Sequence, residues 1–143
     1  QGGDRDQIRA VAAGECDVAL VNTYYLARLT TSKKTTDREA ASKVAIFWPN
    51  QQGRGVHVNV SGAGVTTSAP HRDAAVRLLE FLVGDDAQRI YAQAVFEYPV
   101  KPGIAPAAIV AGWGPFKADG INLALLAKYN GEAVRIADRA GWR

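Results

Sequence analysis

The sequence predicts an α/β fold with a largely parallel sheet. The chain has 143 residues, of which 48% are hydrophobic and 22% charged, which is typical of a globular protein with a core of its own. Apolar residues at helical spacing alternate along the chain with short runs rich in β-branched residues. Glycine and proline separate these segments, and the sequence contains no internal repeat or low-complexity stretch.

The first elements are expected in the order helix, strand and helix. A helix should begin at Asp4, which forms a capping-box pattern with Gln7, and should end at the left-handed stop that Gly14 allows. Residues 17–21 form a β-rich apolar run. Because Asn22 is a favourable N-cap residue, a second helix is expected directly after it.

The remaining elements follow the same alternation. Residues 30–43 are polar and fit either a solvated loop or an exposed helix. The other expected elements are strands at residues 44–48 and 56–60, helices beginning at Pro70 and just after Gly84, and a final helix at about residues 122–139.

Composition excludes some classes of protein. The 17 Lys+Arg against 14 Asp+Glu give a net charge of +3, which is too weak to indicate a nucleic-acid or membrane surface. The chain has no methionine and no apolar stretch of the roughly 18 residues that a membrane span needs. We expect a soluble processed product or fragment, from which an export signal could have been removed. Its one cysteine, Cys16, is expected to be a small buried hydrophobe beside a strand.

Familiar catalytic and cofactor patterns are not found in the sequence. The glycine clusters at residues 53–55 and 62–64 lack the spacing of a dinucleotide fingerprint or a phosphate loop. His57 and His71 have no carboxylate or cysteine at metal-binding spacing, so both are expected to be structural. The chain is therefore not expected to be an enzyme.

The tyrosine pair Tyr24-Tyr25 is the feature most indicative of function. It follows the expected strand at residues 17–21 and opens a helix, where ligands of α/β proteins bind. Tyrosine has a pKa near ~10, so a phenolate at neutral pH needs a compensating cation, and a hard, highly charged metal ion suits two phenolate oxygens. The alternative is that one ring packs in the core and the other lies on the surface.

The segment Gly-Glu-Cys-Asp-Val-Ala-Leu-Val-Asn-Thr-Tyr-Tyr at residues 14–25 is the most specific of five stretches that carry a resemblance to a known family. The others, in the same order as in the family, are residues 54–65, 78–82, 97–100 and 116–119. Together these stretches resemble periplasmic ferric-ion-binding proteins, the solute receptors of iron(III) ABC importers.

This resemblance implies a function and a set of ligands. Tyr24 and Tyr25 would be phenolate ligands to Fe(III), and Asn22 would contact a synergistic anion such as phosphate or carbonate. The chain would bind iron in the periplasm and deliver it to an inner-membrane ABC permease, with tyrosinates that release the ion on acidification.

Members of that family are longer, two-lobed proteins with a type II periplasmic-binding-protein fold. The resemblance therefore implies that this chain is a C-terminal portion. Residues 1–61 would form the lobe segment that carries the tyrosine pair, residues 62–100 would return to the first lobe, and residues 101–143 would form a C-terminal helical segment. We expect the chain to pair with the missing N-terminal lobe, or to self-associate by exchanging elements between copies.

Three alternatives remain open at this point. A receptor of the same fold could use the tyrosines as an aromatic wall for an organic cation. An enzyme could use one tyrosine as a general acid or base, although no partner group is evident. A fragment with only two ligands could keep the fold and fail to hold metal.

Overall fold

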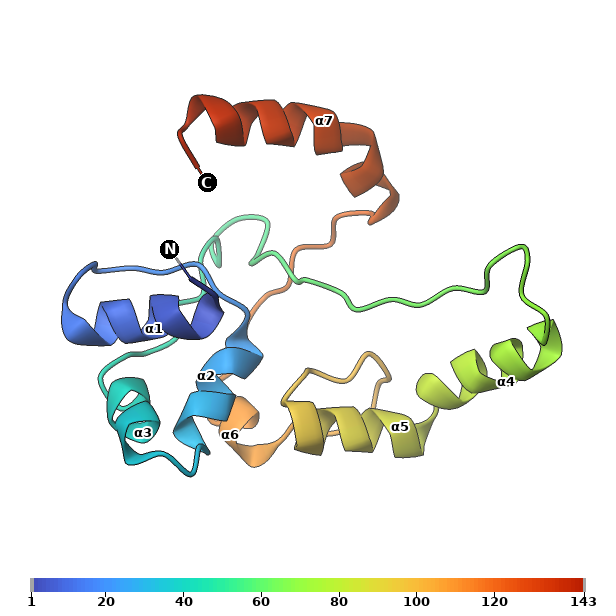
Figure 1. The fold of residues 1–143 in the computed structure, drawn as a ribbon, viewed down its shortest axis with the longest axis horizontal. Coiled ribbons are helices and arrows are strands. Elements are labelled where there is room, and N and C mark those ends of the chain that lie inside the picture. Colours follow the sequence, from blue (N-terminus) through green and yellow to red (C-terminus); the bar gives the residue numbers. More distant parts are fainter. Residues whose placement is uncertain (1, 143) are drawn as a thin grey trace. The chain divides into compact units, whose positions relative to one another are not determined.

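The computed structural model describes residues 2–142, which contain seven α-helices and one π-helix (Figure 1). The chain divides into two compact units. The first contains the residues up to Phe47 together with Asn59–Pro115, and the second contains Trp48–Val58 together with the residues from Phe116 onward. The predicted tyrosine pair lies in the first unit.

Three helices form the core of the first unit. They are α1 (Asp4–Ala13), α2 (Thr23–Thr30) and α3 (Thr35–Ala41), and they lie beside one another in Figure 1. Their shared core consists of Ile8, Leu26, Leu29 and Ala41, with Leu29 only 1% exposed. Residues 30–43, which fitted either a solvated loop or an exposed helix, therefore contain a helix, α3.

The predicted first helix is confirmed, but its capping was assigned to the wrong residue. The N-cap is Gly3, whose backbone N–H donates to Asp6 Oδ2 at 3.1 Å. Asp4 is instead the first helical residue, and its carboxylate accepts hydrogen bonds from Asn22. Gly14 ends the helix with a φ of 78°, the left-handed conformation that was expected of it.

Helix α2 is also supported from its other side. The short helix α6 (Ala108–Ala111), which sequence analysis did not identify, contacts α2. Ala27, Ala107 and Val110 form a second buried cluster. Because α2 is packed on both sides, its first turn has a fixed position in the first unit.

The predicted pair of helices after Pro70 is confirmed. They are α4 (Arg72–Leu82) and α5 (Asp85–Ile90), and α5 continues into the π-helix η1 (Tyr91–Val95). The π-helix ends at Phe96, which has a φ of 63°, an unusual conformation for a large side chain. Helix α4 is only partly covered by the rest of the described chain, since none of its residues is buried.

The predicted parallel sheet is not formed by residues 2–142, so the strands expected at residues 17–21, 44–48 and 56–60 were wrong for this part of the chain. The one β-bridge among these residues joins Val56 to Ala118 in parallel. A β-rich segment becomes a strand only beside a neighbour that accepts its backbone hydrogen bonds. The segments instead leave large side chains in solvent: Val18, Leu20 and Phe47 are 82%, 81% and 83% exposed.

The second unit contains helix α7 (Ala124–Arg139), which confirms the predicted final helix. Two segments of this unit meet around the Val56–Ala118 bridge. There Trp48 stacks on Phe116 with ring centroids 4.5 Å apart, and Arg54 pairs with Asp119 at 3.2 Å. Among the described residues, no helix has the length and apolar character needed to cross a membrane.

We expect the substitution Gly55→Ala to destabilise the second unit. Gly55 has a φ of 98°, and a Cβ atom there would lie 2.6 Å from the backbone oxygen of Lys117. A left-handed backbone and a clash with a fixed carbonyl together should lower the free energy of unfolding by about 2 kcal/mol or more. Urea denaturation followed by tryptophan fluorescence would measure this loss.

The matched control is Gly53→Ala in the same loop. Its Cβ atom would come no closer than 3.8 Å to a neighbouring atom, and its φ is not left-handed. We therefore expect a change within about 0.5 kcal/mol. Equal effects of the two substitutions would contradict the assigned role of Gly55.

Candidate metal centre

Helix α2 presents Tyr24 and Tyr25 in its first turn, two and three residues after the N-cap Asn22. The rest of the helix is anchored, because Leu26, Ala27 and Leu29 are buried. Tyr25 itself packs against the core cluster of the first three helices. Both tyrosines are partly buried. The pair therefore does not consist of one fully buried core ring and one exposed surface ring.

The two phenols lie against each other. Their ring centroids are 4.4 Å apart with an angle of 41° between the ring planes, and a hydrogen bond joins the two side chains. This contact brings two hard oxygen donors to one place at the start of a helix. Phenolate oxygens suit a hard, highly charged cation, which is the donor set that Fe(III) favours.

The environment of Tyr24 opposes a free phenolate. Its pKa is raised to about 12, chiefly by the hydrogen bond with Tyr25, then by burial, and then by the negative charges of Tyr25, Asp4 and Glu97. Tyr24 is therefore a neutral phenol at physiological pH. A metal ion that binds here as a phenolate complex must displace a proton, so binding is coupled to pH.

Arg28 lies one helical turn after Tyr24. Its guanidinium carbon is 5.5 Å from the centre of the Tyr24 ring, within the range of a cation–π contact. Sequence analysis did not single out Arg28, although the spacing i, i+4 on a helix places the two side chains on one face. This contact covers the face of the Tyr24 ring with a cation from the protein itself.

Asn22 has two side-chain partners. Its Nδ2 donates to Asp4 Oδ2 at 3.2 Å, and its Oδ1 accepts from Asn59 Nδ2 at 3.1 Å. The side chain therefore makes no capping hydrogen bond to helix α2, although Asn22 occupies the N-cap position. The sequence pattern predicts the N-cap position of Asn22 and indicates neither of these two partners.

The histidines lie apart from any cluster of ligands. His57 and His71 are both exposed, and His71 is the N-cap residue of α4. Within residues 2–142, no group of three or more His, Cys, Asp or Glu side chains is arranged to hold a metal ion.

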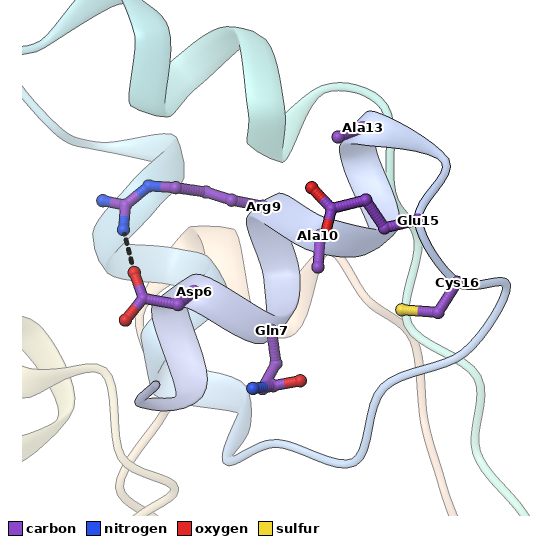
Figure 2. A pocket seen from close by; sticks show the side chains of 7 residues that line it. All are labelled: Asp6, Gln7, Arg9, Ala10, Ala13, Glu15 and Cys16. Carbon is purple, nitrogen blue, oxygen red and sulfur yellow. Dashed lines mark hydrogen bonds and ion pairs between the residues drawn. The ribbon is translucent and has the colours of Figure 1, made fainter. Parts of the chain in front are cut away.

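A surface hollow lies beside helix α1 (Figure 2). It is lined by Asp6, Gln7, Arg9, Ala10, Ala13, Glu15 and Cys16. The prediction that Cys16 is buried was wrong, because its thiol is exposed. A cysteine beside a strand is buried only if a sheet covers it, and no sheet forms at residues 17–21. None of the predicted ligands lines this hollow.

Comparison with known proteins identifies the family. Residues 3–118 match the family model of bacterial extracellular solute-binding proteins. Among curated proteins, the chain is 46% identical to iron uptake protein A2 of Synechocystis over 100% of its own length and 42% of that protein. The chain thus spans less than half the length of this curated relative.

Solved structures of ferric-binding proteins have the same fold. A Trichodesmium protein solved in complex with iron and citrate is 46% identical, with a TM-score of 0.94 over 100% of this chain and 45% of that one. The ferric-binding protein of Campylobacter jejuni is 39% identical, with a TM-score of 0.93 and the same two coverages. This chain matches the C-terminal part of these structures.

These comparisons confirm the predicted solute-binding-protein fold and the resemblance to ferric-ion-binding proteins. The matched structures share the fold across the whole chain, although residues 2–142 on their own form no sheet. The chain belongs to the bacterial extracellular solute-binding protein family, and its similar members are proteins of ferric iron binding and uptake.

Proposed function

We propose that this chain binds Fe(III) through the phenolate oxygens of Tyr24 and Tyr25, as part of the substrate-binding component of an iron(III) ABC importer in the periplasm. The observation that carries the proposal is the direct contact between the two phenols at the start of α2. Named functions of similar proteins support it, since these are iron uptake and ferric iron binding. The chain would capture and deliver iron to an inner-membrane permease without catalysing a reaction.

A synergistic anion such as phosphate or carbonate would complete the coordination at Asn22. The Nδ2 group of Asn22 carries two hydrogens and Asp4 accepts one, which leaves the other for an oxyanion. The helix N-terminus beside it favours negative charge. A similar protein was solved with citrate as well as iron.

Arg28 argues against an aromatic wall that binds an organic cation. The guanidinium group already lies over the Tyr24 ring, so a second cation at the same face would meet a like charge. The oxygen edge of the pair, in contrast, carries two acceptors. Arg28 therefore favours binding at the phenol oxygens over binding at the ring face.

Titration with ferric citrate distinguishes these functions by colour. Ferric tyrosinate complexes absorb visible light, and an aromatic wall that holds an organic cation does not. We expect a broad visible band to appear as iron is added to the purified chain. Absence of the band, with binding of tetramethylammonium detected by tyrosine fluorescence, would favour the receptor for an organic cation.

We also propose that the uncovered apolar segments pair with polypeptide that the matched relatives have and this chain does not. In this arrangement residues 1–61 would belong to the lobe of the tyrosine pair, and residues 62–100 would return to a first lobe. Residues 101–143 would form the C-terminal helical segment. It is supported by the exposed Val18, Leu20 and Phe47, and by a match to only 45% of the structural relatives.

This proposal predicts that the isolated chain self-associates. Side chains such as Leu78 and Phe81 of α4 are more than half exposed, and burying them between copies is favourable. Size-exclusion chromatography with light scattering should give a mass above 15.3 kDa that rises with concentration. Addition of the polypeptide that corresponds to the N-terminal part of the relatives should replace the self-associated form by a one-to-one complex. A monomer at every concentration, without complex formation, would contradict the proposal.

A further inference from the structure

Asp4 holds Asn22 by two hydrogen bonds to a single oxygen. Asp4 Oδ2 accepts from the backbone N–H of Asn22 at 3.0 Å and from its Nδ2 at 3.2 Å. Both contacts are partly buried and join residues 18 positions apart in the sequence. Hydrogen bonds to a carboxylate are stronger than those between neutral groups, so this contact fixes both the backbone and the side chain of Asn22.

The carboxylate also decides which way the amide of Asn22 faces. A carboxylate oxygen only accepts, so Nδ2 must point to Asp4 and Oδ1 must point away from it. Asn59 Nδ2 then donates to that Oδ1 at 3.1 Å. An Asn at an N-cap position usually turns its oxygen to the first-turn N–H groups, and here it does not.

Asp4 is free for this task because its own helix does not need it. The start of α1 is capped through Asp6, which accepts from the Gly3 N–H and also pairs with Arg9. Asp4 and Asp6 lie in the same first turn and differ in what they hold. Asp6 caps its own helix α1, and Asp4 holds Asn22 at the start of α2.

The consequence concerns the tyrosine pair. Tyr24 is two residues after the anchored backbone N–H of Asn22, and the buried half of α2 anchors the helix at its other end. Ligands hold a metal tightly only when their supporting contacts keep them within about 0.5 Å of the required geometry. The Asp4 contact supplies that support at the end of the helix where the phenols lie.

We propose that Asp4 is a positioning residue of the iron site, which acts through Asn22 on Tyr24 and Tyr25. The inference rests on the proposed function for its effect on iron. The two hydrogen bonds from Asn22 to Asp4 are present in the metal-free chain as well.

Three variants of the chain separate positioning from charge and from helix stability. Asp4→Ala removes the acceptor. Asp4→Asn keeps an acceptor oxygen and removes the charge, so it is the rescue variant. Asp6→Ala is the matched control, since it removes an acid from the same helical turn and makes no contact with Asn22.

Iron affinity and the visible spectrum give the first readout, by titration with ferric citrate. Loss of a contact that orients a metal ligand costs about 10- to 100-fold in metal affinity. We expect Asp4→Ala to bind Fe(III) about tenfold more weakly, with a shifted tyrosinate band. Asp4→Asn and Asp6→Ala should stay within about threefold of the parent affinity and keep its band position.

Hydrogen exchange in the metal-free chain gives the second readout. The backbone N–H of Asn22 should exchange at least about tenfold faster in Asp4→Ala than in the parent, and Asp4→Asn, which keeps a weaker neutral acceptor, should exchange at a rate closer to the parent than to Asp4→Ala. Unchanged exchange in Asp4→Ala would overturn the hold on Asn22. Parent-like iron binding by Asp4→Ala, or equal weakening by Asp4→Asn, would overturn positioning by hydrogen bonds. Absence of the visible band in the parent would count against the proposed function, and the exchange rates would still test the contact.

Discussion

Replacement of both Tyr24 and Tyr25 by phenylalanine is expected to lower the apparent affinity for Fe(III) by at least about a thousandfold. Loss of a contact that only orients a metal ligand costs up to about 100-fold, so loss of two ligands must cost more. Phenylalanine keeps the ring contact, whose centroids are 4.4 Å apart, and removes only the oxygens. Competition with increasing citrate would measure the affinity, and the visible band should vanish in the double variant.

The matched control is Tyr129→Phe in helix α7. Tyr129 is 49% exposed and lies in the other unit of the chain, so this variant removes one phenol oxygen from outside the site. We expect parent affinity and an unchanged spectrum. A double variant of Tyr24 and Tyr25 that still bound iron like the parent would exclude the pair as the ligands.

Iron binding is expected to weaken steeply as the pH falls. The raised pKa of Tyr24, about 12, keeps its phenol protonated at neutral pH, so formation of an iron phenolate releases that proton. Each displaced proton makes the apparent affinity fall about tenfold per pH unit. Competition titrations in one buffer series between pH 5 and pH 8 would measure this slope.

The sign of the effect follows from the state of the free site. Hydrogen bonding with Tyr25, burial and nearby negative charges all favour the neutral phenol, so protons compete directly with the metal. Protonation of citrate also changes the concentration of free Fe(III), so the affinity is corrected with the known iron–citrate equilibria at each pH, and the Tyr24→Phe/Tyr25→Phe variant in the same buffers shows any binding that does not involve the pair. A parent chain whose corrected affinity did not change with pH would contradict tyrosinate ligation.

The helices could be predicted because their signals are local. Gly14 ends α1 in the left-handed conformation, and Asn22 occupies the N-cap position of α2, as expected from residue type alone. The error at the start of α1 has a local cause too. Asp4 and Asp6 are equivalent in pattern, and only the folded chain shows that Asp4 faces Asn22.

The strands could not be judged from the same kind of signal. Residues 17–21 have the apolar, β-branched composition of a strand, but a strand also requires a neighbour that composition does not specify. The prediction that Cys16 is buried assumed such a neighbouring strand, and it was wrong because the thiol is exposed. The π-helix η1 and the short helix α6 depend on packing in the first unit, which the sequence pattern does not report.

The sequence singles out the candidate ligands and does not report what surrounds them. Position after an apolar run identified Tyr24 and Tyr25, and the structure places their phenols in contact. The cation over the Tyr24 ring comes from Arg28, and the fixed orientation of Asn22 comes from residues 18 positions before it and 37 after it. Such long-range contacts are set by the fold.

Resonance Raman spectroscopy of the iron-loaded chain tests the central claim most directly. Excitation within the visible band enhances the vibrations of the groups bound to iron, so it identifies the ligands themselves. We expect ring modes of tyrosinate that disappear in the Tyr24→Phe/Tyr25→Phe variant and persist in Tyr129→Phe. An iron-loaded chain without enhanced tyrosinate modes would contradict the proposal that these two phenols bind the metal.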